Sequence, residues 1–494
     1  MSRSNNVPPL RQSGRRHPIH RAMRAVFGAG LTTMSLAACV TGPDFVVPAS
    51  PPATRYTSAP LANLDGRDLQ VNTGDGPPRQ WWTLLGSERL DALEARALAS
   101  NRTLAAARAT LAASQALGAA SESARYPQMD GSATAGRQKF GAAFIGPLNL
   151  PPFTYYSVGP SVSYAFDFSG GLRRSIERQH ALIDHSKYEL QAAEWSVCGN
   201  VALQALAAAS ARSLIQRQQA QIEDDETNLN LVRNAFDAGS GTRVDVLTAQ
   251  SQLDSDRASQ PPLRRALSNA EHQLALLIGA SPADGPVPDF KLDEFLAPAQ
   301  LPIVVPSQIV RRRPDILSAE AQLHADTAAI GVAAANLYPQ MSITASASLQ
   351  ATTLGTLFDA AGAAYGLGAS LTAPLFNHGA LRAKERAAVE SMQASLANYE
   401  QVVLRSFSQV ADALEYLDQD TDLLHSEQSA VSTAAQNLAL TRESYRVGNS
   451  GVLQVLEAQR QSGRANIELL RATAQRAQDV VGLLLAVGGP IPTN

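Results

Sequence analysis

The most constraining feature of the chain is a long internal repeat. Both copies of a Gly-x-Leu-Arg tract and of a Val-Leu-x-Ala-Gln tract are separated by 209 residues (379 − 170 and 455 − 246). A period this long excludes short solenoid repeats. The chain is therefore predicted to hold two copies of one supersecondary unit within a single intertwined body. The recurring tracts are Tyr-Pro-Gln at 126–128 and 338–340, Gly-x-Leu-Arg at 170–173 and 379–382, and Val-Leu-x-Ala-Gln at 246–250 and 455–459.

The N-terminus has the pattern of a bacterial export signal. Six arginines and no acidic residue precede Asp44, and an apolar stretch ends in the sequence Leu-Ala-Ala-Cys at residues 36–39. This arrangement is typical of a lipoprotein signal peptide. We therefore expect removal of residues 1–38 and a covalent lipid on Cys39, with Met1 and Met23 both open as start sites. The alternative is a disordered basic tail with a chance cysteine.

Charge and cysteine content exclude several classes of function. Without its six leader arginines the chain has 35 basic (41 − 6) and 44 acidic side chains, a net charge of −9, which gives no electrostatic basis for binding nucleic acid. With Cys39 acylated, Cys198 has no disulfide partner and is expected in a helix contact. No metal-ligand spacing, nucleophile elbow or phosphate-binding glycine loop occurs, so neither an enzyme nor a cofactor is expected.

Four segments alternate between apolar and small polar residues, as strands with two different faces do. They are residues 129–140, 155–167, 341–350 and 365–375. An ordinary half-buried sheet would show the same pattern, but the export signal favours the wall of an outer-membrane barrel. Single-chain barrels of this kind begin at eight strands, and open edges are not tolerated in lipid. Four strands therefore require a barrel shared by two chains, with eight strands, or three chains, with twelve.

Two very long helices are predicted at residues 172–237 and 381–447, because apolar residues recur every seven positions in both. Sustained heptads indicate helices wound on neighbours. A second helix follows each turn, at 244–278 and 452–485. Gly239 and Gly448 suit the left-handed position that ends a helix. Either Ser240 or Thr242 is expected to cap the first following helix, and Ser450 the second.

The predicted organisation has six parts. Residues 1–38 are the signal peptide, 39–80 an extended lipid-anchored lead, 81–280 the first repeat, 281–306 a proline-rich linker or equatorial segment, 307–488 the second repeat and 489–494 the tail. A break between two helices is expected near residues 101–103. A helix is expected to start at the sequence Arg-Arg-Arg-Pro-Asp (311–315), where we favour structural ion pairing for the arginines over a basic patch.

Taken together, these motifs resemble the outer-membrane factor (TolC-like) family, in its lipoprotein branch that serves resistance-nodulation-division tripartite efflux pumps. The resemblance covers essentially the whole mature chain. It is carried by Leu36–Cys39 with the following Gly-Pro-Asp-Phe, by the signature Arg312, Arg313, Pro314 and Asp315 with Glu320 behind it, and by residues 338–340, 379–382 and 445–459.

The resemblance implies an α+β membrane protein and a homotrimer. Its barrel would have twelve strands, four from each chain, in outer-membrane lipid, continuous with a periplasmic coiled-coil tunnel and a mixed equatorial region. It also implies a periplasmic adaptor protein as a direct partner and the inner-membrane pump as an indirect one. The adaptor would contact the two helical turns, at Gly239, Ser240, Thr242, Arg243, Gly448, Asn449 and Ser450.

The same resemblance implies that the turns close the resting tunnel with acidic rings. Family members with such rings have acids where this chain has Gln454 and Glu457, so one of the two acids is absent. Asp245 on the other turn could supply the negative charge instead. We hypothesise that Glu457 lines a cation-selective constriction; a solvated carboxylate at a helix end is the alternative.

The expected function is an outer-membrane channel that passes small molecules out of the cell. A channel for type I protein secretion has the same architecture, but the lipid anchor and the Arg-Arg-Pro-Asp signature argue against it. A soluble coiled-coil protein would leave the four alternating segments and the lipoprotein site unexplained. The exported compound, the partner pump and the partner adaptor cannot be read from the sequence.

Overall fold

The computed structural model describes residues 40–49, 55–58, 70–73, 76–139, 151–284, 288–295 and 300–489. The predicted signal peptide, Cys39 and residues 490–494 lie outside this part of the chain. The described residues form two compact units. Among the described residues, the first unit comprises residues 40–43, 124–139, 151–175 and 330–385, and all the others belong to the second.

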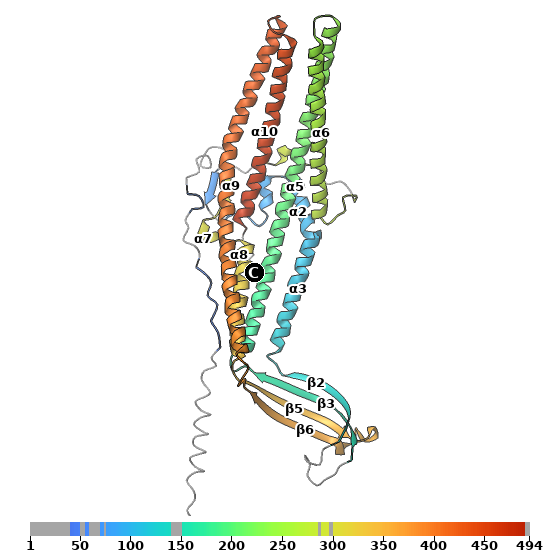
Figure 1. Cartoon of the computed structure of the whole chain (residues 1–494), viewed down its shortest axis with the longest axis vertical. Coiled ribbons are helices and arrows are strands. Elements are labelled where there is room, and N and C mark those ends of the chain that lie inside the picture. Colours follow the sequence, from blue (N-terminus) through green and yellow to red (C-terminus); the bar gives the residue numbers. More distant parts are fainter. Residues whose placement is uncertain are drawn as a thin grey trace, which may run out of the picture. The chain divides into compact units, whose positions relative to one another are not determined.

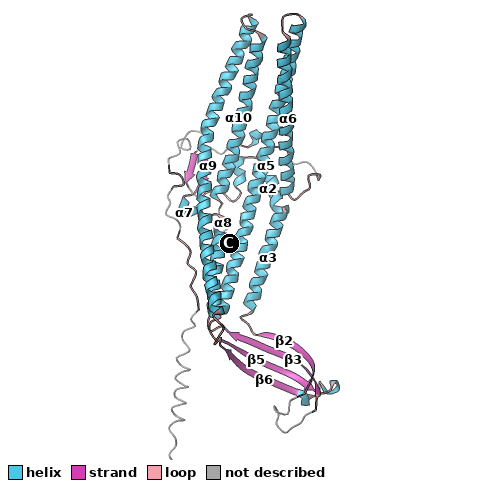
Figure 2. Ribbon diagram, viewed as in Figure 1, coloured by secondary structure: helices cyan, strands magenta, loops and turns pink. Residues whose placement is uncertain are grey.

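The first unit contains a four-stranded antiparallel sheet in the order β2-β3-β5-β6 (Figures 1 and 2). The four predicted strands are confirmed, with their ends moved by a few residues. Because the order is open, β2 and β6 are its two edges. The elements are β2 (Gln128–Gln138), β3 (Phe153–Phe166), β5 (Gln340–Ala351) and β6 (Ala363–Thr372), with short 3-10 turns η3 (Leu354–Thr356) and η4 (Ala360–Gly362) before β6.

Pro160 lies within β3, where a proline removes one ladder hydrogen bond. The β3–β5 pairing pauses at Gly159 and Pro160 and resumes in the same register, from Val158 opposite Leu349 to Ser161 opposite Ser346. A Cβ atom on Gly159 would lie 2.0 Å from the carbonyl oxygen of Ala347. The chain therefore passes the proline without a bulge, and the space beside Gly159 leaves no room for a side chain.

Two helical hairpins dominate the second unit (Figure 1). Their long helices, α5 (Gly171–Asp237) and α9 (Ala380–Arg446), have 67 residues each and begin 209 residues apart (380 − 171). Their partners are α6 (Arg243–Leu277) and α10 (Val452–Val487). All four predicted helices are confirmed to within two residues. None of the described helices combines the length and apolar character needed to cross a bilayer.

The predicted heptad positions are buried in the middle of the long helices and become exposed toward the turns. Val403, Val410 and Leu417 of α9 are 0–3% exposed, whereas Tyr445 at its end is 50% exposed. On the first hairpin, Ile222, Leu229 and Val232 of α5 pack against Val246 and Leu253 of α6. The heptad pattern thus marks the contact between the helices of a hairpin.

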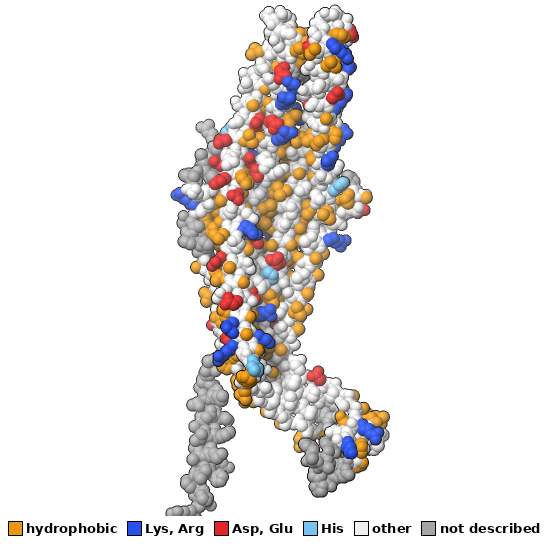
Figure 3. Space-filling model, in the orientation of Figure 1, with side chains coloured by type: hydrophobic (Ala, Val, Ile, Leu, Met, Phe, Trp, Pro, Cys, Tyr) orange, Lys and Arg blue, Asp and Glu red, His pale blue; other side chains and the backbone are white. Residues whose placement is uncertain are grey.

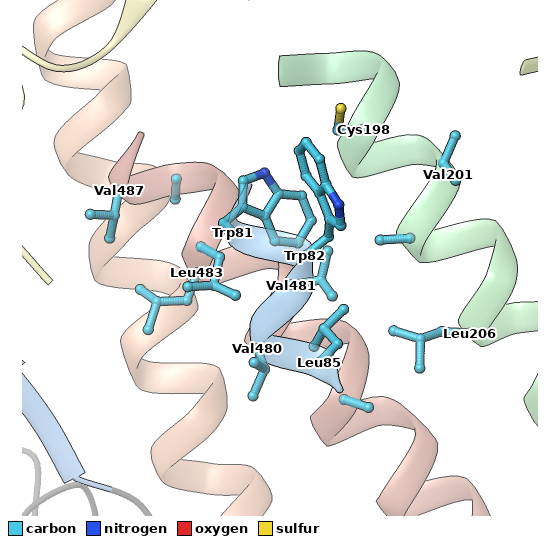
Figure 4. Close-up of a cluster of buried hydrophobic side chains, with 14 of the residues drawn as sticks. Trp81, Trp82, Leu85, Cys198, Val201, Leu206, Val480, Val481, Leu483 and Val487 are labelled. Atoms are coloured by element: carbon cyan, nitrogen blue, oxygen red, sulfur yellow. The ribbon is translucent and has the colours of Figure 1, made fainter. Parts of the chain in front are cut away.

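A hydrophobic core lies between the elements in the middle of the helical unit (Figure 4). Trp81, Trp82 and Leu85 form a buried turn that packs between α5 and α10. The core also takes Phe290, Leu292 and Phe295 from the segment predicted as a linker. The remaining elements are β1 (Gln70–Thr73), which pairs in parallel with β4 (Gln300–Ile303), η1 (Trp81–Leu85), α2 (Glu88–Ser100), α3 (Arg102–Ser123), η2 (Leu292–Glu294), α7 (Pro306–Ile309) and α8 (Pro314–Ala335).

Candidate functional site

The first helical turn, between α5 and α6, is built from a glycine and a capping box. Gly239 has a φ of +75°, as predicted, and the next helix begins after Thr242. The Thr242 hydroxyl accepts a hydrogen bond from the Asp245 backbone N–H (3.3 Å), and the Asp245 carboxylate accepts one from the Thr242 N–H (2.8 Å). The Thr242 hydroxyl also donates to the Asp245 carboxylate at 2.8 Å, and this hydrogen bond, together with the one from the Thr242 N–H, lowers the pKa of Asp245. The cap is therefore Thr242, while Ser240 bonds the Ala235 carbonyl.

The second turn, between α9 and α10, differs at its cap. Gly448 takes the left-handed conformation, with a φ of +79°. The predicted cap Ser450 is wrong: Gly451 occupies the cap position, and its N–H donates to the Gln454 side chain at 3.2 Å. The Ser450 hydroxyl instead donates to the Thr441 carbonyl. The Gln454 side chain, three residues after the cap, thus accepts the hydrogen bond from the cap N–H that a glutamate carboxylate often accepts in a capping box.

The second turn also adjoins a hollow of about 510 Å³ between α9 and α10. Its walls are mostly hydroxyl and amide side chains, with Leu440 as an exposed apolar residue at 72% exposure. Four residues singled out in the sequence line it, namely Asn449, Ser450, Gln454 and Glu457. Arg243 and Ser240 lie exposed on the other turn.

Glu457 has close partners. Its carboxylate forms an ion pair with Arg460 and accepts a hydrogen bond from Gln461 at 3.3 Å. Arg460 in turn donates to Gln252 of α6 at 2.8 Å, which ties the two hairpins together. The Glu457 side chain remains 47% exposed.

The arginine signature fixes the end of α10. Arg313 is buried and donates two hydrogen bonds to Asp315 (3.0 and 2.7 Å) and one to the Ala486 carbonyl (2.9 Å). Arg311 pairs with Glu320 at 3.0 Å. The predicted ion-pairing role is confirmed for these two arginines. Pro314 is the first residue of α8, as predicted, and Arg312 lies beside Pro314 in the wall of a cavity with Trp82 and Trp195.

Sequence reasoning missed a set of buried carboxyl groups. Asp225 of α5 is 6% exposed and faces Asp256 of α6; one of its oxygens has no hydrogen-bond donor among the described residues. Burial, reinforced by the neighbouring carboxyl, raises the pKa of Asp225 to about 7. Asp420 of α9 faces Asp479 of α10 in the same way, with its pKa raised to about 7. Each hairpin therefore holds one carboxyl pair between its two helices.

A third buried carboxyl lies in the hydrophobic core. Glu94 of α2 is fully buried beside the Cys198 thiol. Burial raises the pKa of Glu94 to about 9 and raises the pKa of Cys198 as well, so both groups are neutral at pH 7. Cys198 is a free, buried cysteine, as expected for a helix contact. The described residues hold no group of three side chains suited to a metal ion.

Comparison with known proteins gives a consistent result. The chain matches the model of the outer membrane efflux protein family over residues 93–280 and 305–489. It is 30% identical over 446 residues to the pyoverdine export outer membrane protein OpmQ of Pseudomonas aeruginosa, with 89% of this chain and 91% of that protein covered. It is 26% identical over 461 residues to the probable outer membrane lipoprotein SilC of Salmonella typhimurium, covering 93% and 97%.

Among solved structures, the outer-membrane channel OprN aligns with a TM-score of 0.83 at 26% identity, covering 92% of this chain and 99% of that one. The family model spans well over half of the chain, and the fold agrees with that of a known channel. The chain therefore belongs to the outer membrane efflux protein family and is a channel component of an efflux system in the bacterial outer membrane.

Proposed function

We propose that three copies of this chain share one twelve-stranded barrel in the outer membrane and one helical tunnel below it. The observation that carries this proposal is the open sheet, in which β2 and β6 each leave one side unpaired. Unpaired backbone N–H and C=O groups cost several kcal/mol each in hydrocarbon, so about ten residues of free edge cannot face lipid. Edge pairing between chains removes this cost.

The helices supply a second argument for association. α9 exposes large apolar side chains that are unusual on a helix facing only water: Leu404 is 61% exposed, Tyr416 54% and Leu440 72%. Neighbouring chains would cover them in a closed ring of helices. Two chains would give eight strands and three would give twelve; the resemblance to outer-membrane factors favours three.

We propose that the cargo consists of small molecules delivered by a periplasmic adaptor and an inner-membrane resistance-nodulation-division pump. The adaptor would contact the two helical turns and enter the hollow between α9 and α10. That hollow presents hydroxyl and amide groups around an exposed leucine, a surface suited to a polar partner helix with apolar anchors. The relative OpmQ is named for the export of pyoverdine rather than of a protein, which favours efflux over protein secretion.

We also propose that Glu457 lines a cation-selective constriction, with Asp245 as a second source of negative charge. Glu457 keeps about half of its surface exposed despite its ion pair with Arg460. In the Glu457→Gln channel we expect lower selectivity for K⁺ over Cl⁻. The matched control is Glu468→Gln, because Glu468 pairs with Arg471 at the same spacing on the same helix, farther from the turn. Unchanged selectivity in Glu457→Gln would remove the proposed role.

The lipid anchor belongs to the same proposal. Cys39 would carry the lipid, and the lead that follows it reaches Thr41, whose N–H and hydroxyl both donate to the Ser169 carbonyl. The buried Arg174 side chain also donates to the Thr41 and Gly42 carbonyls. These contacts support a lead that is fixed within two residues of the acylated cysteine. Intact-protein mass spectrometry of the mature chain tests the modification directly.

The decisive experiment is single-channel recording of the detergent-purified protein in planar bilayers, together with its mass in the same detergent. We expect a trimer that inserts and conducts small, cation-preferring currents. A monomer that never inserts would refute the shared barrel. A dimer that conducts would retain edge pairing but refute the strand number of twelve.

A further inference from the structure

One end of the sheet carries a group of exposed aromatic side chains. The register brings the starts of β2 and β5 and the ends of β3 and β6 to the same end, since Gln128 lies opposite Ser163, Met341 opposite Phe166 and Gln340 opposite Thr372. Aromatic residues lie at this end in all four chain segments and are 37–80% exposed. This aromatic girdle consists of Tyr126, Phe166, Phe168, Tyr338 and Phe376.

Exposed cations lie next to the girdle. Arg125 precedes β2, Arg173 follows β3, and Arg382 and Lys384 follow β6, all within the unit that contains the sheet. We call these four residues the basic collar. Basic side chains are visible at the surface where α9 begins (Figure 3). Among the described residues, none of the four lies in an ion pair.

The nearby acids form no ion pair with the collar among the described residues. The Asp167 carboxylate accepts hydrogen bonds from the backbone N–H groups of Leu172 (3.0 Å) and Arg173 (2.9 Å), where it caps α5. Glu385 is half-buried, and Asp130 alternates with Met129 on the opposite face of β2. Within the described part of this unit, no carboxylate therefore forms an ion pair with the basic collar.

Helix electrostatics does not explain the collar either. Arg173 and Arg382 occupy the same position, three residues after the glycine of the repeated Gly-x-Leu-Arg tract, in the first turns of α5 and α9. The first turn of a helix carries partial positive charge, so a cation there is unfavourable by a few tenths of a kcal/mol within the chain. Both copies nevertheless hold an arginine at this place, which points to an anion outside the chain.

We propose that the basic collar binds the phosphate groups of anionic phospholipids in the periplasmic leaflet of the outer membrane. The aromatic girdle would lie where headgroups meet acyl chains, the usual depth of Tyr and other amphipathic rings. Arginine and lysine beside that depth reach headgroup phosphates with their flexible stems. This inference rests on the proposed function, because only a sheet inserted in lipid brings the collar to the headgroups.

The test measures which lipids the intact trimer retains. The full-length protein is reconstituted in nanodiscs of equal phosphatidylglycerol and phosphatidylethanolamine with identical acyl chains, and native mass spectrometry counts the lipids that stay bound. The collar variant is Arg125→Gln, Arg173→Gln, Arg382→Gln and Lys384→Gln. The control removes four exposed, unpaired arginines from the helical unit, by the changes Arg264→Gln, Arg265→Gln, Arg405→Gln and Arg442→Gln.

We expect the wild type and the control variant to retain phosphatidylglycerol in preference to phosphatidylethanolamine. A single cation near an anionic lipid surface is worth about a fivefold change in binding, so the collar variant should lose at least about tenfold of that preference. The wild-type preference should also decline between 50 and 500 mM salt, because headgroup contacts are screened. If the collar variant fails to insert, the double variant Arg382→Gln, Lys384→Gln and the salt series of the wild type still test whether the collar binds anionic headgroups.

Several results would overturn the proposal. The first is equal retention of the two lipids by the wild type, and the second is a loss of lipid preference in the control variant equal to that in the collar variant. The third is preferential retention of lipopolysaccharide in mixed bilayers. The fourth is a collar variant that partly dissociates into monomers, while the trimers that remain keep the lipid preference of the wild type. The last result would assign the collar to a contact between neighbouring chains. A failure of the proposed function is distinguishable, since it would appear as absent conductance, whereas a failed collar leaves conductance normal.

Discussion

The carboxyl pair between α5 and α6 leads to a prediction about pH. The pKa of Asp225 rises from its ordinary value of 3.8 to about 7, so the folded chain binds this proton more tightly than the unfolded chain. Stability contributed by the protonated pair is therefore fully present below about pH 4 and is lost as the pH rises through about 7. Asp225→Asn keeps the shape and removes the titration.

The size of the effect follows from the shift. A change of about 3 pH units corresponds to a ceiling of about 4 kcal/mol. Because the neighbouring Asp256 is partly solvated and screening reduces the repulsion, we expect about half of that, about 2 kcal/mol, at pH 8. This is roughly a 30-fold change in a local opening equilibrium. At pH 5 the wild type and the variant should agree to within about 1 kcal/mol.

Amide hydrogen exchange of residues 218–232 in the detergent-purified protein measures this opening, after correction for intrinsic rates at each pH. Asp225→Asn should be better protected than the wild type at pH 8, and the difference should shrink to within about 1 kcal/mol at pH 5. Glu223→Gln is the matched control, since Glu223 lies on the same helix two residues away, is exposed and does not contribute to the shift of Asp225. Equal protection of Asp225→Asn and the wild type at pH 8 would refute a shared proton between the two helices.

Three further predictions concern single residues. Because burial raises the pKa of Glu94 from 4.5 to about 9, the free energy of unfolding of the wild type should fall as the pH rises from about 4.5 to about 9 and then level off, and Glu94→Gln should remove this decline; urea unfolding that shows the same decline in both proteins would contradict this. Arg313→Ala removes the bonds to Asp315 and Ala486, and thermal unfolding should show a cost of about 2–4 kcal/mol that Arg313→Lys restores only partly; full restoration by lysine would argue against the bidentate geometry. Thr242→Ala should cost about 1 kcal/mol and speed hydrogen exchange only at the start of α6; equal acceleration at the α9–α10 turn would indicate a global effect.

The long elements could be predicted because their periodicity is local. Heptads defined both 67-residue helices, and alternation defined the four strands, since each pattern is repeated many times within one segment. Caps were less predictable, because several short polar residues compete for one position. Thr242 took the role that Ser240 could have taken, and Gly451 with Gln454 displaced Ser450.

The carboxyl pairs could not be predicted, because they depend on how two helices are aligned across a turn. Asp225 meets Asp256, and Asp420 meets Asp479, only after the hairpins fold, and the two pairs do not occupy equivalent positions in the repeat. Likewise, the short parallel pairing of β1 with β4 joins segments about 230 residues apart and lacks any sequence pattern of its own.

The pairing of β3 with β5 has a consequence for the order of folding. It joins a strand of the first copy to a strand of the second, with Phe166 opposite Met341 and Tyr156 opposite Ala351. Contacts between residues so far apart in the chain are slow to form, because the entropy cost of closing a long loop comes before the contacts can stabilise it. The N-terminal hairpin of strands therefore has to wait, unpaired on both sides, until the second copy has been synthesised and exported. During that interval its edges are open to pairing with any other chain, so this intermediate is the stage at which the protein is most prone to aggregate.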